Sequence, residues 1–112
     1  MLNSYEKIYR LFACTLNFDN ELTFISPRVK EILGYEPKEM LFKTLFQFIP
    51  KEESEQFLQK INFFKENLTS FWSLRCNFIK KNGETVMLEI NGVAVYDKSR
   101  NLCGYEGITY EV

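Results

Sequence analysis

The sequence predicts an α+β fold: one five-stranded antiparallel sheet in the strand order 2-1-5-4-3, with short helices and one longer helix covering one face. Three observations predict it. Two β-rich runs within 71–96 meet at Asn82-Gly83, a shorter pair of runs lies within 11–25, and the segment 26–67 between them carries helical patterns. Because an insert between two hairpins of one sheet has to cross a face of that sheet, we expect a helical layer on a strand layer.

Length and composition indicate a single domain over 1–112. The chain has 112 residues, of which 46% are hydrophobic and 11 are Phe, which suffices for one core and leaves no room for a second domain. We expect an N-terminal flanking helix over 1–10 and the domain core over 11–112.

Charge and cysteine content exclude several partner classes. With 14 Lys and Arg against 15 Asp and Glu the net charge is −1, and no basic stripe is present that could bind nucleic acid. No run reaches the roughly 18 apolar residues that a membrane span needs, so we expect no membrane crossing by this domain. The 3 cysteines are widely separated, which suits a reducing compartment, and the predicted location is cytoplasmic.

The first residues of the chain show helical spacing. Apolar side chains recur at Leu2, Tyr5, Ile8 and Tyr9, which predicts a short amphipathic helix. Two roles are open for it: it packs against its own core, or it makes a dimer contact.

The first predicted hairpin pairs residues 11–16 with residues 22–25, across a polar turn. Ser26 followed by Pro27 then predicts a helix start, because serine caps a helix and proline fits its first position. Gly34 fits the left-handed residue that ends such a helix, which is two turns long.

The segment 35–50 is apolar and irregular, and we expect it to lie against the sheet. A longer helix is predicted from Pro50 to about Asn67, because acidic residues cluster at its start, where the helix dipole favours them. The predicted buried stripe of this helix consists of Phe57, Ile61 and Phe64.

The central hairpin follows from strict alternation on both sides of Asn82-Gly83, a pair typical of a type I′ turn. Alternation places two apolar rows on the face that needs a cover. These rows are Trp72, Leu74, Cys76 and Phe78 on one strand and Val86, Leu88, Ile90 and Ala94 on the other. A turn at 97–100 leads into the last predicted strand, from Leu102 to about Val112.

Several motifs together resemble a PAS domain, a sensory module of signal-transduction proteins. The segment 18–27 is similar to the opening hairpin and Ser-Pro helix start of that family, and 32–40 to its leucine-glycine-tyrosine signature. The segments 81–90 and 104–108 resemble its fourth and fifth strands. The likeness runs from about residue 10 to the C-terminus.

The resemblance implies a regulatory input module of a histidine kinase or another two-component phosphorelay protein, which signals through ligand occupancy or dimer rearrangement. The alternative is a constitutive protein-protein interaction or dimerisation module with a filled core and no ligand. Glu111-Val112 resembles the end of the last strand of the family, which is followed there by a signalling helix. We therefore expect an output domain after Val112. We expect no catalysis by this domain, because its sequence has no nucleophile–histidine pair and no glycine-rich phosphate loop. A catalytic domain, if present, is expected elsewhere in the parent protein.

No cofactor is predicted. Haem in this fold usually takes an axial histidine, and the chain has none. The photoactive flavin relatives carry a cysteine in the segment that matches 39–48, where this chain has none. Cys14, Cys76 and Cys103 are interpreted as small buried hydrophobes, and no metal site is expected.

A ligand of the family would lie between the helices and the sheet, where a small apolar ligand of unknown identity could enter. The predicted lining is Phe46, Phe48, Ile49, Phe57, Ile61, Phe64, Leu74, Cys76, Phe78, Leu88 and Ile90. The competing interpretation is that these rings fill the space completely.

Apolar side chains also interrupt the opposite face of the predicted sheet. A patch of this kind rarely stays exposed on a monomer, so we expect a homodimer through this face and the N-terminal helix. The predicted interface consists of Tyr5, Ile8, Tyr9, Phe71, Ile79, Met87, Val93 and Val95.

Overall fold

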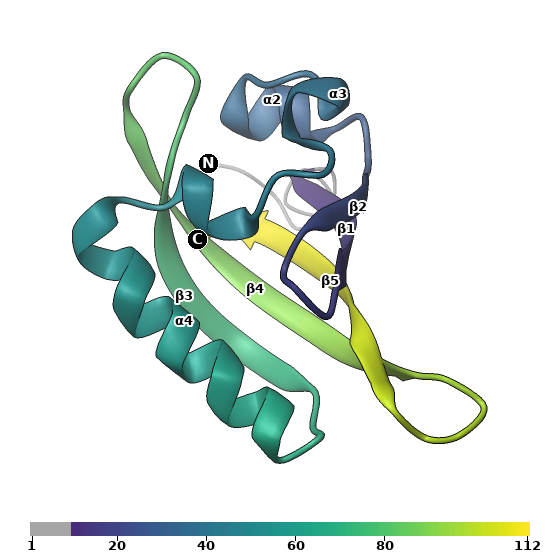
Figure 1. Ribbon diagram of the computed structural model, residues 1–112. Coiled ribbons are helices and arrows are strands. Elements are labelled where there is room, and N and C mark those ends of the chain that lie inside the picture. The colour runs from purple at the N-terminus through teal and green to yellow at the C-terminus, as the bar shows by residue number, and fades with distance from the viewer. Residues whose placement is uncertain (1–9) are drawn as a thin grey trace.

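The computed structural model describes residues 10–112 and shows one antiparallel sheet with helices on one face (Figure 1). The elements in chain order are β1 (Leu11–Asn17), β2 (Leu22–Ile25), α2 (Val29–Leu33), α3 (Pro37–Met40), the 3-10 helix η1 (Leu45–Phe48), α4 (Lys51–Glu66), β3 (Phe71–Ile79), β4 (Thr85–Tyr96) and β5 (Leu102–Glu111). The strand order is β2-β1-β5-β4-β3, as the sequence predicts. The predicted helix over 1–10 lies outside the described residues, save Arg10.

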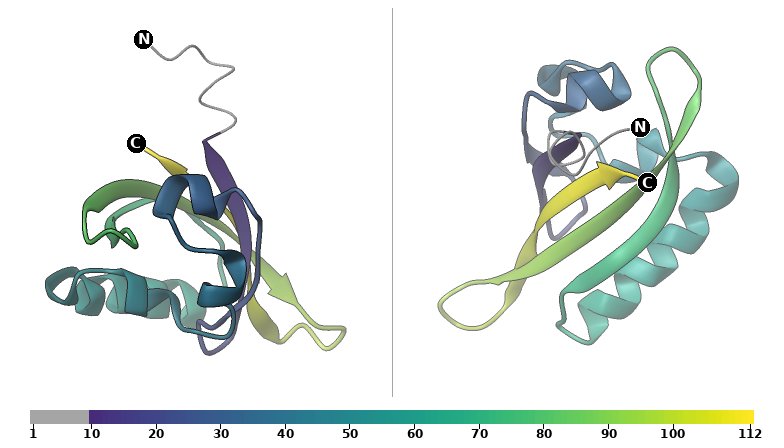
Figure 2. Two further views of the ribbon diagram at one scale, coloured as in Figure 1. Left: turned by 90° about the horizontal axis from the view of Figure 1, so that it is seen from above. Right: turned by 180° about the vertical axis from the view of Figure 1, so that it is seen from behind.

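The helices share one side of the sheet, and the β4–β5 hairpin extends beyond the rest of the molecule (Figure 2). From residue 10 onward, no helix covers the opposite side, which we call the outer face. The N-terminal and C-terminal strands are neighbours, since Leu11 pairs with Tyr110. Arg10 and Glu111 form an ion pair of 2.6 Å beside this pairing.

The first hairpin continues into α2, with one difference from the prediction. Ser26 does not cap the helix with its side chain, because its hydroxyl oxygen accepts the Ala13 N–H at 2.9 Å. The Ser26 carbonyl accepts the Val29 N–H instead. Gly34 has φ 86° and donates its N–H to the Lys30 carbonyl, so the left-handed end of the helix is confirmed.

The segment between α2 and α4 lies against the sheet as predicted, through four buried side chains. They are Met40, Leu45, Phe48 and Ile49. Phe42 is the exception: it has φ 63° and is 72% exposed, because the chain turns there to pair with Leu22 on the edge strand.

The long helix α4 begins after Pro50 and ends at Glu66, followed by Asn67 as its C-cap, close to the predicted bounds, and its Phe57 and Ile61 are buried. Its last turn is attached to the first hairpin through Lys65, which donates to the Phe18 carbonyl and lies 4.9 Å from the centre of the Phe18 ring. Partial burial of this amino group lowers the pKa of Lys65.

The turn between β3 and β4 is longer than the predicted type I′ turn. Residues 80–84 form the loop, in which the Lys80 N–H donates to the Glu84 carbonyl at 2.7 Å. Gly83 has φ 90°, whereas Asn82 has no positive φ and accepts the Glu84 N–H with its side chain. The pairing Ile79 with Thr85 still keeps the alternation of the hairpin.

A β-bulge at the start of β3 reverses two predicted side chains. Phe71 pairs with Gly92 and Leu74 with Ile90, so three steps along β3 match two along β4. Ser73 lies inside the bulge at φ 57°. Phe71, predicted on the outer face, is therefore buried, and Trp72, predicted in the inner row, is 63% exposed on the outer side.

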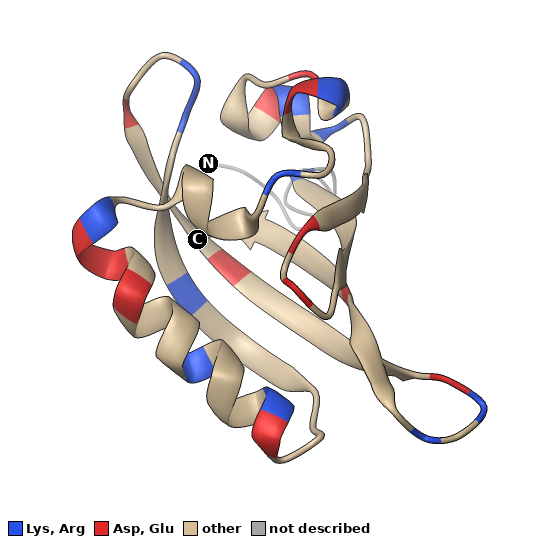
Figure 3. Cartoon of the chain, viewed as in Figure 1, with Lys and Arg blue, Asp and Glu red and all other residues tan. Residues whose placement is uncertain are grey.

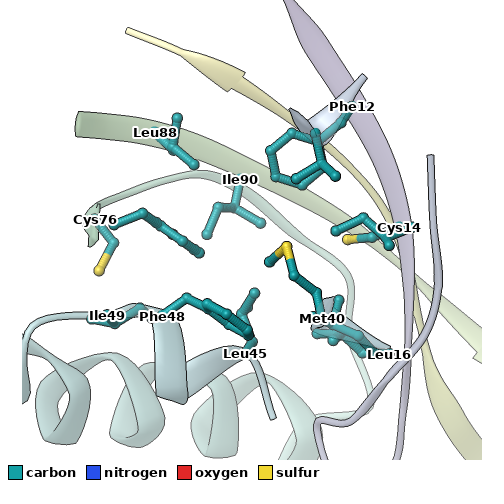
Figure 4. Packing of buried hydrophobic residues seen from close by; sticks show 14 of the residues in the cluster. Phe12, Cys14, Leu16, Met40, Leu45, Phe48, Ile49, Cys76, Leu88 and Ile90 are labelled. Carbon is teal, nitrogen blue, oxygen red and sulfur yellow. The ribbon is translucent and has the colours of Figure 1, made fainter. Parts of the chain in front are cut away.

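The core fills the space between the sheet and the helices (Figure 4). Phe12 and Cys14 of β1, Leu88 and Ile90 of β4 and Met40 converge there (Figure 4). At the other end of the core, Phe71 lies between Phe64 and Tyr105, with ring centres at 5.6 Å and 4.9 Å.

Candidate functional site

The predicted ligand pocket maps onto the inner face of the sheet and the helices that cover it. Eight of the predicted lining residues are buried: Phe48, Ile49, Phe57, Ile61, Cys76, Phe78, Leu88 and Ile90. The other three, Phe46, Phe64 and Leu74, are partly buried against the same cluster. The structure brings this set together, and whether it ever surrounds a ligand stays a prediction.

Little free space remains among the eight buried residues, whereas Phe64 and Leu74 line a groove between α4 and β3. Met40, Phe78 and Leu88 have an exposed fraction of 0%, and Phe48 has 6%. Since the walls of a cavity large enough for water count as accessible surface, such values indicate side chains in contact on all sides. Aromatic rings contribute, with the centres of Phe46 and Phe57 at 5.8 Å and those of Tyr35 and Phe48 at 5.2 Å.

The cysteines divide into two kinds. Cys14 and Cys76 are buried, as expected, and burial raises the pKa of Cys14 to about 12 and that of Cys76 to about 11. Cys103 is exposed at the start of β5, which corrects the prediction that all three are buried, because it alternates with the buried Leu102 and Gly104 and points away from the core. The thiols are free, and within residues 10–112 no three His, Cys, Asp or Glu side chains are grouped to hold a metal ion.

The outer face carries a groove of about 450 Å³, which we call the outer groove. It crosses all five strands. Its lining residues are Ala13, Cys14, Thr15, Phe24, Trp72, Asn91, Val93, Glu106, Gly107 and Ile108. Small residues of β1 and β5 form part of the floor, while Phe24 and Trp72 come from the two edge strands and are at least half exposed. The outer groove is therefore largely apolar and open to solvent.

One polar contact holds the wall of this groove, and a second lies beside it. The Asn91 side-chain carbonyl accepts the Ser73 N–H at 2.9 Å and so holds the bulge that turns Trp72 outward. Beside it, Arg75 donates to the nearly buried carboxylate of Glu89 at 3.1 Å. Figure 3 shows that most charged residues lie on the helices and loops, whereas the strands carry few.

The predicted interface residues are distributed unevenly. Met87 and Val93 are exposed on the outer face, and Ile79 and Val95 are half-buried. Phe71 belongs to the core, because the bulge in β3 turns it to the inner face. Tyr5, Ile8 and Tyr9 lie outside the described residues. Sequence alternation missed Trp72, Phe24 and Ile108. Phe24 lies in β2, where two consecutive residues are exposed, so simple alternation does not identify its face.

Helices of membrane-spanning length and hydrophobicity do not occur in residues 10–112.

Comparison with known proteins agrees with the fold. A sequence model of the family described as "PAS domain" matches residues 11–110. No curated protein matches the sequence.

Three solved structures illustrate the likeness. The PAS domain of a Colwellia psychrerythraea protein is similar with a TM-score of 0.83 at 12% identity, over 95% of this chain and 89% of that chain. The N-terminal domain of a Marinobacter aquaeolei diguanylate cyclase with PAS/PAC sensor has a TM-score of 0.79 at 14% identity, over 90% and 94%. The PAS-B domain of Drosophila melanogaster Cycle with bound ethylene glycol has a TM-score of 0.77 at 15% identity, over 90% and 97%.

Proposed function

This chain belongs to the PAS domain family, a family of sensory modules, and we propose that it signals through a protein contact at its outer groove. The contact we propose is with a second copy of the chain, so that the sensory event is a change in dimer geometry. The observation that carries this proposal is the combination of a tightly packed core with an apolar groove on the outer face.

Burial and chemistry support the outer groove as the contact surface. Trp72, Val93 and Ile108 are between 48% and 63% exposed and line one groove. Large apolar side chains gathered in this way rarely stay in water on a monomer, and aromatic anchors contribute most to protein interfaces. The ion pair of Arg75 with Glu89 lies beside them and gives such a contact a polar rim.

The parent protein that we propose is a histidine kinase or another two-component phosphorelay protein of the cytoplasm, with an output domain after Val112. The domain itself is proposed to be non-catalytic. Support comes from the family alone, whose members regulate attached domains. The coding sequence that follows Val112 tests this part: a kinase or cyclase segment there supports it, and a metabolic enzyme or an unrelated structural domain contradicts it.

The oligomeric state of purified protein tests the contact. We expect a dimer by light scattering after size exclusion, and Val93→Glu is expected to give monomers because it places a charge in the groove. The control is Phe42→Glu, which adds the same charge at a side chain 72% exposed in the helical layer and should leave the dimer intact. A monomeric wild type at 100 μM, or a dimer that survives Val93→Glu, would refute the proposal.

A bound effector is the second route by which such a module senses, and the Drosophila PAS-B structure holds a bound ethylene glycol. For this chain the low accessibility of Phe48, Phe78 and Leu88 favours the contact over the ligand. Native mass spectrometry and visible absorbance separate the two routes. A small molecule retained by the purified protein supports a ligand, and a mass equal to that of the polypeptide alone supports a filled core.

A further inference from the structure

The strand β3 leaves one of its two hydrogen-bonding sides free. It lies at the end of the sheet order, so only β4 pairs with it. The Lys80 N–H points toward β4, and backbone groups alternate in direction along an antiparallel strand. The N–H groups of Arg75, Asn77 and Ile79 therefore point away from the sheet. Within residues 10–112, those of Arg75 and Ile79 have no hydrogen-bond partner.

A groove of about 500 Å³ runs beside this edge, between β3 and α4. Figure 1 shows the two elements side by side over most of their length. The groove is lined by Gln56, Gln59, Lys60, Phe63, Phe64 and Leu74. Phe63 is 60% exposed, so an aromatic ring of α4 contacts solvent where the edge strand is unpaired.

One end of the edge is closed by the protein itself. The carboxylate of Glu53, near the start of α4, accepts the Asn77 N–H at 3.3 Å and the Asn77 side-chain amide at 3.1 Å. Acidic side chains at strand edges commonly prevent unwanted pairing. Arg75 lies two residues before Asn77, beside the open groove. No side chain of residues 10–112 accepts its backbone N–H.

We propose that the groove between α4 and β3 binds an extended peptide segment of a partner protein, which adds a sixth strand to the sheet at Arg75. Backbone pairing with an edge strand and alternate side chains in an adjoining groove are the two elements of strand addition. The apolar side chain of the segment would lie against Phe63, Phe64 and Leu74. A neighbouring acidic side chain would face Lys60, which forms no ion pair within residues 10–112.

This proposal can be tested apart from the outer groove, because the two grooves share no lining residue, although Trp72 of β3 belongs to the outer one. A dimer through the outer face and a peptide at the β3 edge can therefore each fail alone.

The experiment titrates 15N-labelled protein with a blocked five-residue peptide of alternating valine and glutamate. We expect the backbone amide resonance of Arg75 to move downfield as its N–H group becomes hydrogen-bonded, together with shifts of the Phe63 and Lys60 resonances. The matched control peptide has the same sequence with methyl groups on alternate backbone nitrogens, which removes the donors and is expected to bind at least tenfold more weakly.

Two protein variants test the side chains. Lys60→Glu reverses the groove charge and should weaken peptide binding severalfold, whereas Lys98→Glu makes the same change in the distant β4–β5 turn and should have no effect. Equal binding of the methylated peptide, resonance shifts confined to the outer face, or no shift at millimolar peptide would each overturn the proposal.

Discussion

Gly92 shows at the scale of single residues how tightly the inner layer is packed. It lies opposite Phe71, and a Cβ atom at this position would be 2.4 Å from the tip of the Phe71 ring. The ring cannot move aside easily, because Phe64 and Tyr105 hold it on both sides. Glycine is needed here for space, not for backbone freedom.

Gly92→Ala should therefore destabilise the domain by about 1–3 kcal/mol, the usual cost of overpacking a core. The free energy of unfolding from urea titrations measures it. Gly83→Ala is the control, since no atom lies within 4 Å of its added Cβ and only the positive φ opposes it. A Gly92→Ala variant as stable as the wild type would show that Phe71 has room to move.

The cysteines lead to a prediction on reactivity. At pH 8 a thiol reagent should label Cys103 rapidly and leave Cys14 and Cys76 unlabelled in the native protein, because burial keeps both thiols protonated and out of reach. Mass spectrometry of labelled peptides measures this, and denaturant should release all three thiols. Rapid native labelling of Cys76 would contradict the packing described for β3.

The same burial makes stability depend on pH in the alkaline range. The pKa of Cys14 is raised from 9.0 when exposed to about 12 when folded, so the unfolded chain loses the proton first. Unfolding above pH 9 therefore releases protons, and the free energy of unfolding should fall as the pH rises. Cys14→Ala should show a shallower fall between pH 9 and pH 11 in denaturant titrations, whereas an unchanged slope would mean that other groups cause it.

At the scale of elements, the bulge in β3 decides which surface each aromatic residue joins. The Asn91 side chain holds the Ser73 N–H, and the extra residue turns Phe71 inward and Trp72 outward. The same bulge thus completes the core and supplies a wall of the outer groove.

This arrangement predicts opposite effects for two neighbouring substitutions. Phe71→Ala should cost about 3–5 kcal/mol because it leaves a cavity in the core, while Trp72→Ala should change stability by less than about 1 kcal/mol. Thermal unfolding distinguishes them. If a dimer forms through the outer groove, Trp72→Ala should weaken it; the reverse order of stabilities would show that β3 has no bulge.

The loop 67–70 is a second element whose position depends on side chains far away in sequence. The Tyr105 hydroxyl donates to the Thr69 carbonyl at 3.0 Å, and the Ser70 hydroxyl oxygen accepts the Ala94 N–H at 2.9 Å. The Tyr96 hydroxyl donates to the Leu68 carbonyl. These bonds attach the end of α4 to β4 and β5.

At the scale of the whole molecule, the main distinction is between a filled core and a core that holds a guest. The buried rings leave little space between sheet and helices. Assigning the chain to a fold from its sequence does not reveal how completely this space is filled.

Cavity creation tests this distinction. Benzene should not raise the melting temperature of the wild type, because an apolar guest needs an existing void. Phe48→Ala removes a large buried ring and should lower stability by about 3–5 kcal/mol, with benzene then restoring part of the loss. A wild type stabilised by benzene to the same extent as Phe48→Ala would show that the native core already contains a cavity.

Much of the architecture followed from sequence patterns because those patterns act locally. The alternation in 85–96, the left-handed Gly34 and the proline before α4 each depend on neighbouring backbone geometry, which single residue types favour. Together with the resemblance of several motifs to one family, they determined the strand order and the helical layer.

The tertiary structure alone decided which faces the aromatic residues occupy and how full the core is. Phe71 and Trp72 changed places because a bulge depends on Asn91 of another strand, a contact that no local pattern encodes. Free space likewise depends on how rings from β1, η1, α4 and β5 fit together in three dimensions. Periodicity identifies a buried residue, whereas only the packed neighbours determine whether a ligand has room beside it.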